Sequence, residues 1–115
     1  MSIQAQILVA GNVMQSTTAD NATATATVAA ITGATHRMLG VSADYDVAVT
    51  AIKTITIIQG STTLIAYKWD FTNGAFHFAF PAALRGVLSG AVSATLEASG
   101  AGSTNGRISL YHFAN

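Results

Sequence analysis

Hydrophobic and polar residues alternate with a period of two along most of this chain. Residues 22–28 alternate Ala and Thr almost without interruption, which places Thr on one face and Ala on the other. Residues 53–59 place Ile55 and Ile57 on one face and threonines on the opposite face. Because successive side chains of a β-strand point to opposite faces, this alternation predicts half-buried strands.

The same period continues through the second half of the chain, where turn residues interrupt it. Further alternating stretches occupy residues 62–71, 75–80, 92–97 and 107–113. Gly60-Ser61 and Asn73-Gly74 are typical of tight hairpins. The segment 81–86 begins with the single proline and is expected to form one helical turn at most. The pattern therefore predicts an all-β chain that folds as one antiparallel β-sandwich domain.

The first twenty residues differ from the rest of the chain. The apolar residues Ile3, Ile7 and Val9 come first, and a polar stretch rich in Ser and Thr follows at residues 13–20. Two interpretations are open. Residues 1–20 are either the first strand of the sandwich or an arm that pairs with another chain by strand addition, with the sandwich domain at 21–115.

Aromatic residues gather in two neighbouring stretches. They are Tyr67, Trp69 and Phe71 in the first stretch and Phe76, Phe78 and Phe80 in the second. A hairpin at Asn73-Gly74 would place the two rows side by side. Lys68 and Asp70 occupy the opposite face, which favours core packing for the aromatic rows. The alternative is an exposed strip that forms an interface or stacks against sugars.

Charge is scarce. The chain has five acidic and five basic side chains in 115 residues, or 9%, whereas a typical soluble domain has about 25%. A surface with so little charge and no net charge is poorly protected against association. This composition predicts a building block whose surface is covered by other copies or by a partner.

Several residues are candidates for such contacts. Segment 54–58 is uncharged and β-prone, so its strand is expected either to lie inside a sheet or to be covered by a neighbouring subunit. The candidate interface residues are Ile3, Ile7, Val9, Ile55, Ile57 and Trp69.

Catalytic, cofactor and metal sites are not expected. There is no Cys, and His36, His77 and His112 lack the spacing of metal-ligand or hydrolase motifs. Asp44 and Asp46 have the Asp-x-Asp form of calcium loops, but without the Gly and Glu that follow in such loops a turn role is favoured. An enzyme would need several of the His and Asp residues to converge.

Other classes of function are also disfavoured. The five basic residues are dispersed, which argues against a nucleic-acid partner. No apolar stretch is long enough for a membrane helix and no signal peptide is visible, so the chain is expected to be made in the cytoplasm and to stay soluble.

The strands and corners between residues 35 and 113 resemble small all-β virion proteins of tailed bacteriophages. The segments that carry the resemblance are 35–43, 53–63, 78–86, 91–102 and 106–111. The resemblance implies a jelly-roll-like sandwich, usually trimeric, on the capsid or on an appendage. It supplies no catalytic residue.

Together these features predict a virion structural protein. The expected role is a homotrimeric capsid decoration or cement protein, located on the capsid surface, that bridges subunits of the major capsid protein and stabilises the head. The alternative is a tail-fibre or head-fibre tip module that binds host glycan through exposed Trp69 and Tyr67. Exposure of Trp69 in a concave polar site would favour the alternative, and its burial would favour the structural role.

Overall fold

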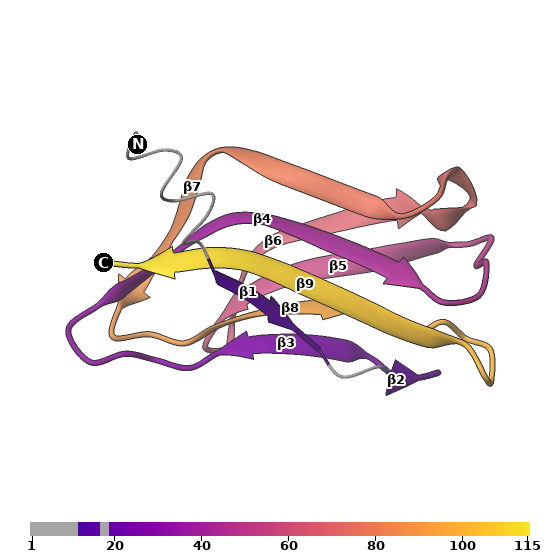
Figure 1. Ribbon diagram of the computed structural model, residues 1–115, viewed down its shortest axis with the longest axis horizontal. Coiled ribbons are helices and arrows are strands. Elements are labelled where there is room, and N and C mark those ends of the chain that lie inside the picture. Colours follow the sequence, from indigo (N-terminus) through magenta and orange to yellow (C-terminus); the bar gives the residue numbers. More distant parts are fainter. Residues whose placement is uncertain (1–11, 17–18) are drawn as a thin grey trace.

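The computed structural model, which describes residues 12–16 and 19–115, consists almost entirely of antiparallel strands (Figure 1). The strands are β1 (Asn12–Gln15), β2 (Ala19–Asp20), β3 (Ala24–Val28), β4 (Thr35–Tyr45), β5 (Ile52–Gln59), β6 (Thr62–Asp70), β7 (Phe76–Leu88), β8 (Val92–Leu96) and β9 (Asn105–Ala114). A short 3₁₀ helix, η1 (Phe71–Asn73), follows β6. None of the helical structure in these residues is long and apolar enough to cross a membrane.

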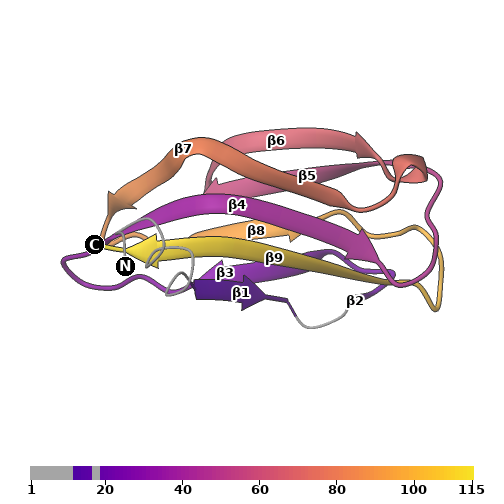
Figure 2. The same cartoon turned by 45° about the horizontal axis from the view of Figure 1, so that its top comes forward.

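The strands form two sheets that pack face to face. Sheet A has the order β1-β9-β4-β7, with β2 also paired to β9, and sheet B has the order β3-β8-β5-β6. Sheet A lies in front of sheet B in Figure 1, and Figure 2 shows the two layers from a raised angle. The predicted antiparallel β-sandwich is confirmed.

The topology is that of a jelly roll. The hydrogen-bonded pairs β1–β9, β3–β8, β4–β7 and β5–β6 show that the first half of the chain runs antiparallel to the second half. This double-stranded ribbon turns back at the β5–β6 hairpin and folds over itself into two sheets. The hairpin has the predicted Gly60-Ser61 turn, with Gln59 opposite Thr62 and Gly60 at a φ of 58°.

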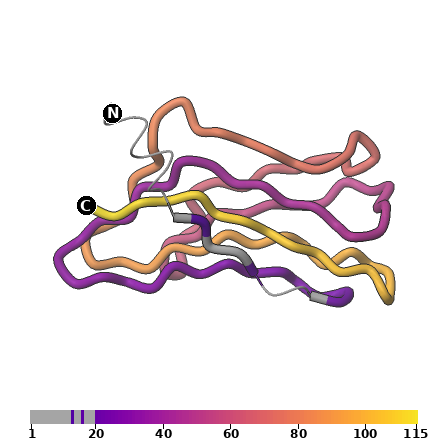
Figure 3. Tube along the Cα trace, viewed as in Figure 1, coloured from indigo at the N-terminus to yellow at the C-terminus, as the bar shows by residue number. Residues whose placement is uncertain are grey.

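The connections gather at the two ends of the sandwich (Figure 3). The end that we call the histidine end holds the connections 29–34, 60–61 and 89–91. The opposite end, which we call the acidic end, holds the connections 46–51, 71–75 and 97–104.

The Asn73-Gly74 segment is not the hairpin that the sequence predicts. Strands β6 and β7 belong to different sheets, and η1 carries the chain across the sandwich between them. The Asp70 side chain accepts a 3.0 Å hydrogen bond from the Thr72 backbone, and Phe71 is buried. These two contacts turn the chain inward before a two-residue hairpin can close.

The core consists of alternating side chains from both sheets. The fully or nearly buried apolar residues are Ala24, Ala26, Val28, Met38, Val41, Ala43, Ile55, Ile57, Phe71, Phe76, Val92, Ala94, Leu96, Ile108 and Leu110. Strand β5 lies between β8 and β6 and is therefore an interior strand, which is one of the two alternatives that its composition indicates.

Part of the N-terminal segment belongs to the sandwich. Residues 12–15 pair with β9 and residues 19–20 pair with its beginning, so both stretches extend sheet A. The apolar stretch that contains Ile3, Ile7 and Val9 lies outside the described residues.

Strand β7 is irregular where it passes the middle of β4. Met38 is opposite Leu84 and Gly40 is opposite Ala79, so the four residues 80–83 of β7 face a single residue of β4. Pro81 lies in this bulge, where its missing N–H interrupts no ladder. The expected helical turn at 81–86 is wrong, because these residues continue β7.

We expect Gly40→Ala to destabilise the sandwich by about 1–3 kcal/mol. A Cβ at Gly40 would lie 2.6 Å from the Phe78 carbonyl oxygen, a backbone atom that cannot move aside cheaply. Denaturant unfolding of the purified variant measures the effect. Gly102→Ala is the matched control, because a Cβ there meets nothing within 4 Å, and an equal loss in both variants would contradict the steric argument.

Candidate functional site

The three predicted interface residues that the structure describes do not lie on one surface. Ile55 and Ile57 are 0% exposed and are covered by core residues of this chain, so they stabilise the sandwich and offer no surface to a second copy. Trp69 is half-buried at the edge formed by β6 and β7. Ile3, Ile7 and Val9 lie outside the described residues.

Five aromatic residues close the β6–β7 edge of the sandwich. These residues, which we call the aromatic edge, are Tyr67, Trp69, Phe76, Phe78 and Phe80. The Tyr67 ring lies 5.6 Å from Phe76 and 5.0 Å from Phe78, and Trp69 lies 5.7 Å from Phe76 in an edge-to-face arrangement. The rows therefore meet across the gap between the sheets, rather than side by side within one sheet.

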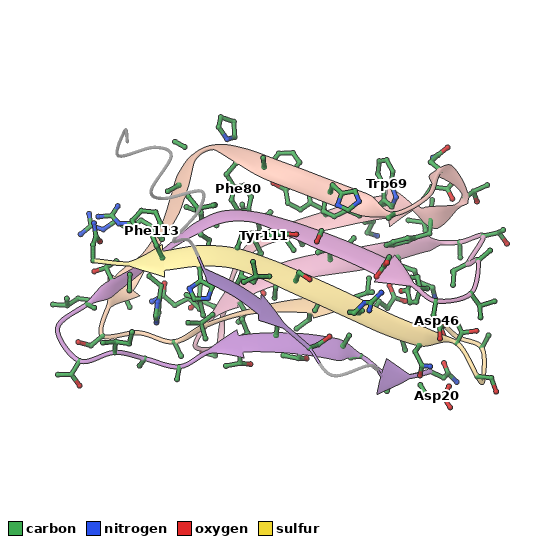
Figure 4. All side chains as sticks on the ribbon, viewed as in Figure 1. Asp20, Asp46, Trp69, Phe80, Tyr111 and Phe113 are labelled. Carbon is green, nitrogen blue, oxygen red and sulfur yellow. The ribbon has the colours of Figure 1, made fainter. Side chains whose placement is uncertain are left out.

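Trp69 is a packing residue in this arrangement. Its indole Nε1 donates a 3.0 Å hydrogen bond to the Gly74 carbonyl, which fixes the ring over the turn after η1. Figure 4 shows Trp69 beside this turn and Phe80 farther along β7. A ring held in this way packs against the core and has its polar atom satisfied by the backbone.

Three exposed apolar residues lie at the histidine end, one on the connection 29–34 and two at the end of β7. Ile31, Val87 and Leu88 are 50%, 59% and 65% exposed, and we call them the apolar tip. A 2.7 Å bond from the Ser89 amide to the Ala34 carbonyl holds the two connections together. A shallow, mostly apolar groove of about 350 Å³ borders Val87.

The sequence interpretation missed the apolar tip. The sequence did contain a sign of it, namely two adjacent apolar residues, Val87 and Leu88, directly after Gly86. The predicted helical turn over 81–86 is incompatible with a strand there, whereas β7 continues through Val87 and Leu88 to the end of the sandwich.

A polar groove lies on the outer face of sheet A. It has a volume of about 290 Å³ and is lined mainly by Ser42, Asp44, His77, Arg107, Ser109 and Tyr111. Tyr111 lies over the middle of β9 in Figure 4, with its hydroxyl 3.3 Å from the Ser42 hydroxyl. The Arg107 Nε lies 3.6 Å from an Asp44 oxygen. The groove combines an aromatic ring, hydroxyls and a charged pair.

Asp44 and Asp46 have different partners and do not form a shared site. Both Asp46 oxygens accept hydrogen bonds from Asn105, at 2.7 Å from its backbone amide and 3.0 Å from its side chain. These bonds lower the pKa of Asp46 below its usual value. Within residues 12–16 and 19–115, no three His, Cys, Asp or Glu side chains gather as a metal site would require.

A hydrogen-bonded tyrosine lies between the two aspartates in sequence. The Tyr45 hydroxyl donates a 2.6 Å hydrogen bond to the Glu97 carbonyl. Burial, followed by the charge of Glu97, raises the pKa of Tyr45 to about 12. The phenol therefore stays protonated at neutral pH and joins the two sheets as a donor.

The three histidines differ in their exposure to solvent. His77 is exposed in the polar groove, as expected for a solvated side chain, whereas His36 and His112 are buried at the histidine end. The side chains of His36 and His112 therefore face the interior of the sandwich.

Comparison of the chain with protein-family models, curated proteins and solved structures found no match. The candidate surfaces are therefore the apolar tip, the aromatic edge and the polar groove, judged on their own geometry.

We expect Phe76→Ala to lower the free energy of unfolding more than Phe78→Ala, because Phe76 belongs to the core and Phe78 lies at the surface of the aromatic edge. Phe76 is 6% exposed, so its truncation should cost about 3–5 kcal/mol of stability. Phe78 is 37% exposed, so its truncation should cost about 1–2 kcal/mol. Denaturant unfolding measures both values, and similar losses would show that the two rings are equally part of the core.

Proposed function

We propose that this chain is a structural subunit of a bacteriophage virion, a homotrimeric decoration protein that binds the major capsid protein. The jelly roll supports this assignment, because viral capsid domains use the fold repeatedly. A fold alone does not determine function, since lectins and cupins share it. The observation that carries the proposal is the exposed apolar tip.

The apolar tip has the properties of a contact between copies. Val87 and Leu88 are more than half exposed, and burying an aliphatic side chain completely stabilises an interface by about 1.5–3 kcal/mol. Arg37 and Arg85 are paired directly opposite one another nearby, and arginine is enriched at interfaces. Three copies arranged around an axis would cover the tips of all three.

The outer face of sheet B supports the same role. Thr25, Thr95 and Thr56 lie next to one another across three strands, with Ala66 next in the row. The core of a protein interface is depleted in charge, and this row has none. An uncharged row of this kind suits contact with an ordered neighbour such as a capsid surface.

We expect the purified chain to have three times the 11.8 kDa chain mass by light scattering at micromolar concentration. Leu88→Lys should shift the mass towards that of the monomer, because a buried ammonium would have no partner at the tip. Ile52→Lys is the matched control, since Ile52 is 62% exposed at the acidic end. A wild-type monomer, or equal effects of both variants, would contradict the trimer contact.

The location in the virion needs its own measurement. Mass spectrometry of purified particles should find this chain in a fixed ratio to the major capsid protein. Its absence from the particles would overturn the virion assignment even if the trimer forms.

The polar groove favours a second candidate function, glycan binding by a fibre-tip module. Saccharides are bound by aromatic faces together with planar polar side chains, and Tyr111, Asp44 and Arg107 supply both. This site differs from the one expected from sequence, because Trp69 has its N–H bonded to Gly74.

We expect saturation-transfer NMR with neutral and acidic oligosaccharides to show contacts if the groove is a glycan site. Tyr111→Ala and Arg107→Ala should each remove the transfer, while Lys68→Ala on the outer face of sheet B should leave it unchanged. Transfer that persists in the groove variants, or is absent in the wild type, would eliminate this candidate.

A further inference from the structure

Two of the three histidines are buried beside each other at the histidine end of the sandwich. His36 is 1% exposed and His112 is 6% exposed. They lie on the neighbouring strands β4 and β9. His112 is opposite Met38, and Met38 comes two residues after His36 on β4. Their ring centroids are 6.1 Å apart and the rings are nearly perpendicular. We call these two residues the histidine pair.

The hydrogen bonding of the histidine pair is incomplete. His36 Nε2 donates a 2.7 Å hydrogen bond to the Ala29 carbonyl, which assigns the proton of this ring to Nε2. His36 Nδ1 and both ring nitrogens of His112 are buried without a partner in the described part of the chain. A buried polar group without a partner lowers stability, so these imidazoles are poorly explained as structural residues.

No acidic side chain is positioned to compensate a charge on these rings. The strands β1, β3 and β8 and the connections 29–34 and 89–91 contain no titratable residue, and residues 1–11 contain no titratable side chain. On β4 and β9 the nearest acidic residue is Asp44, six residues beyond Met38, or about 20 Å along the strand.

The charged side chains of this end are both cationic. Arg37 follows His36 directly in the sequence, and Arg85 on β7 lies opposite Arg37. The Arg37 Nε donates a 3.2 Å hydrogen bond to the Asn115 side chain. The five acidic residues, Asp20, Asp44, Asp46, Asp70 and Glu97, all lie towards the acidic end. A proton taken up by the histidine pair would therefore enter an apolar core with no acidic side chain beside it.

We propose that the histidine pair is an acid-sensitive switch, and that protonation of His112 at mildly acidic pH loosens the histidine end of the sandwich. A charged imidazole in this position loses its hydration and gains no acidic side chain as a counter-ion. The favourable response is for the end to open, so that the ring reaches water. The bond from His36 to Ala29 connects this response to the segment 29–34, which carries Ile31 of the apolar tip.

The direction of the pH dependence follows from the protonation equilibrium. Burial, and then the charge of His36, hold the pKa of His112 below its ordinary value of 6.5. Above pH 6.5 His112 is neutral in both the folded and the unfolded state, so its protonation does not reduce the free energy of unfolding. Below pH 6.5 the unfolded state binds a proton that the folded state does not, so stability falls until the folded pKa is reached.

A second acid transition is separate from this one. Hydrogen bonds lower the pKa values of Asp46 and Asp70 below their ordinary 3.8, so their contributions are lost as pH falls below 3.8. Measurements between pH 8 and pH 4.5 therefore lie above the transition of these two carboxylates.

The test is denaturant unfolding of the full chain across this range, at one protein concentration. The unfolding equilibrium constant of the wild type should rise by up to about tenfold per pH unit below pH 6.5. His112→Leu should flatten this dependence and leave the protein at least as stable at pH 8, because it removes two unpartnered polar atoms. His77→Leu is the matched control on the same sheet and should keep the wild-type dependence.

Three results would overturn the proposal: a wild type with no dependence between pH 8 and pH 4.5, a His112→Leu variant that keeps it, or a His77→Leu variant that loses it. If His112→Leu does not fold, NMR of the wild type decides instead. The His112 ring resonances should titrate with a midpoint below 6.5, and a midpoint at or above 6.5 would overturn the proposal. None of these measurements depends on trimer formation or on a virion role.

Discussion

The close approach of the two sheets on one side of the sandwich is the constraint on which the rest of the structure depends. On that side the core residues are small, with Ala24 and Ala26 on β3 and Ala94 on β8. Cα atoms of β3 and β8 come within 8 Å of β9 in the opposite sheet. Small side chains allow this separation, because larger ones would force the sheets apart.

The opposite side of the sandwich follows from the same constraint. The twist of two packed sheets separates them towards one edge, and the side chains there must be larger to exclude water. The aromatic edge supplies them, with Phe76 buried and Phe78 at the boundary with solvent. Small residues at one edge and aromatic residues at the other therefore form one continuous core, in which Trp69 contributes to packing more than to recognition.

Much of the fold could be predicted from the sequence, because the period of two is a property of the strand itself. The alternation around Ile55 and Ile57 predicts buried side chains, and both are fully buried. The alternation fails at Leu64. Ile57 is opposite Ile65 and Ile58 is opposite Thr63, so Leu64 is an extra residue without a paired residue on β5. This bulge lets Leu64 pack against the core although it shares the predicted solvent face with Lys68. A bulge depends on pairing with a neighbouring strand and leaves no local signal.

The candidate surfaces were harder to predict than the fold, because they depend on which strands become edges. The Asn-Gly dipeptide is a strong hairpin signal, but burial of Phe71 and the Asp70 cap on Thr72 place β6 and β7 in different sheets. That change converts an expected sheet face into the aromatic edge and makes β7 the edge of sheet A.

Scarcity of charge connects the proposed assembly to the proposed acid response. Ten charged side chains on 115 residues leave large uncharged surfaces, which favour contact between copies. The same scarcity leaves β3 and β8 without a carboxylate that could reach His36 or His112. With the acidic residues towards the other end, a proton at the histidine pair has no acidic side chain nearby to compensate it. A composition that favours association thus also makes one end of the sandwich sensitive to a single protonation.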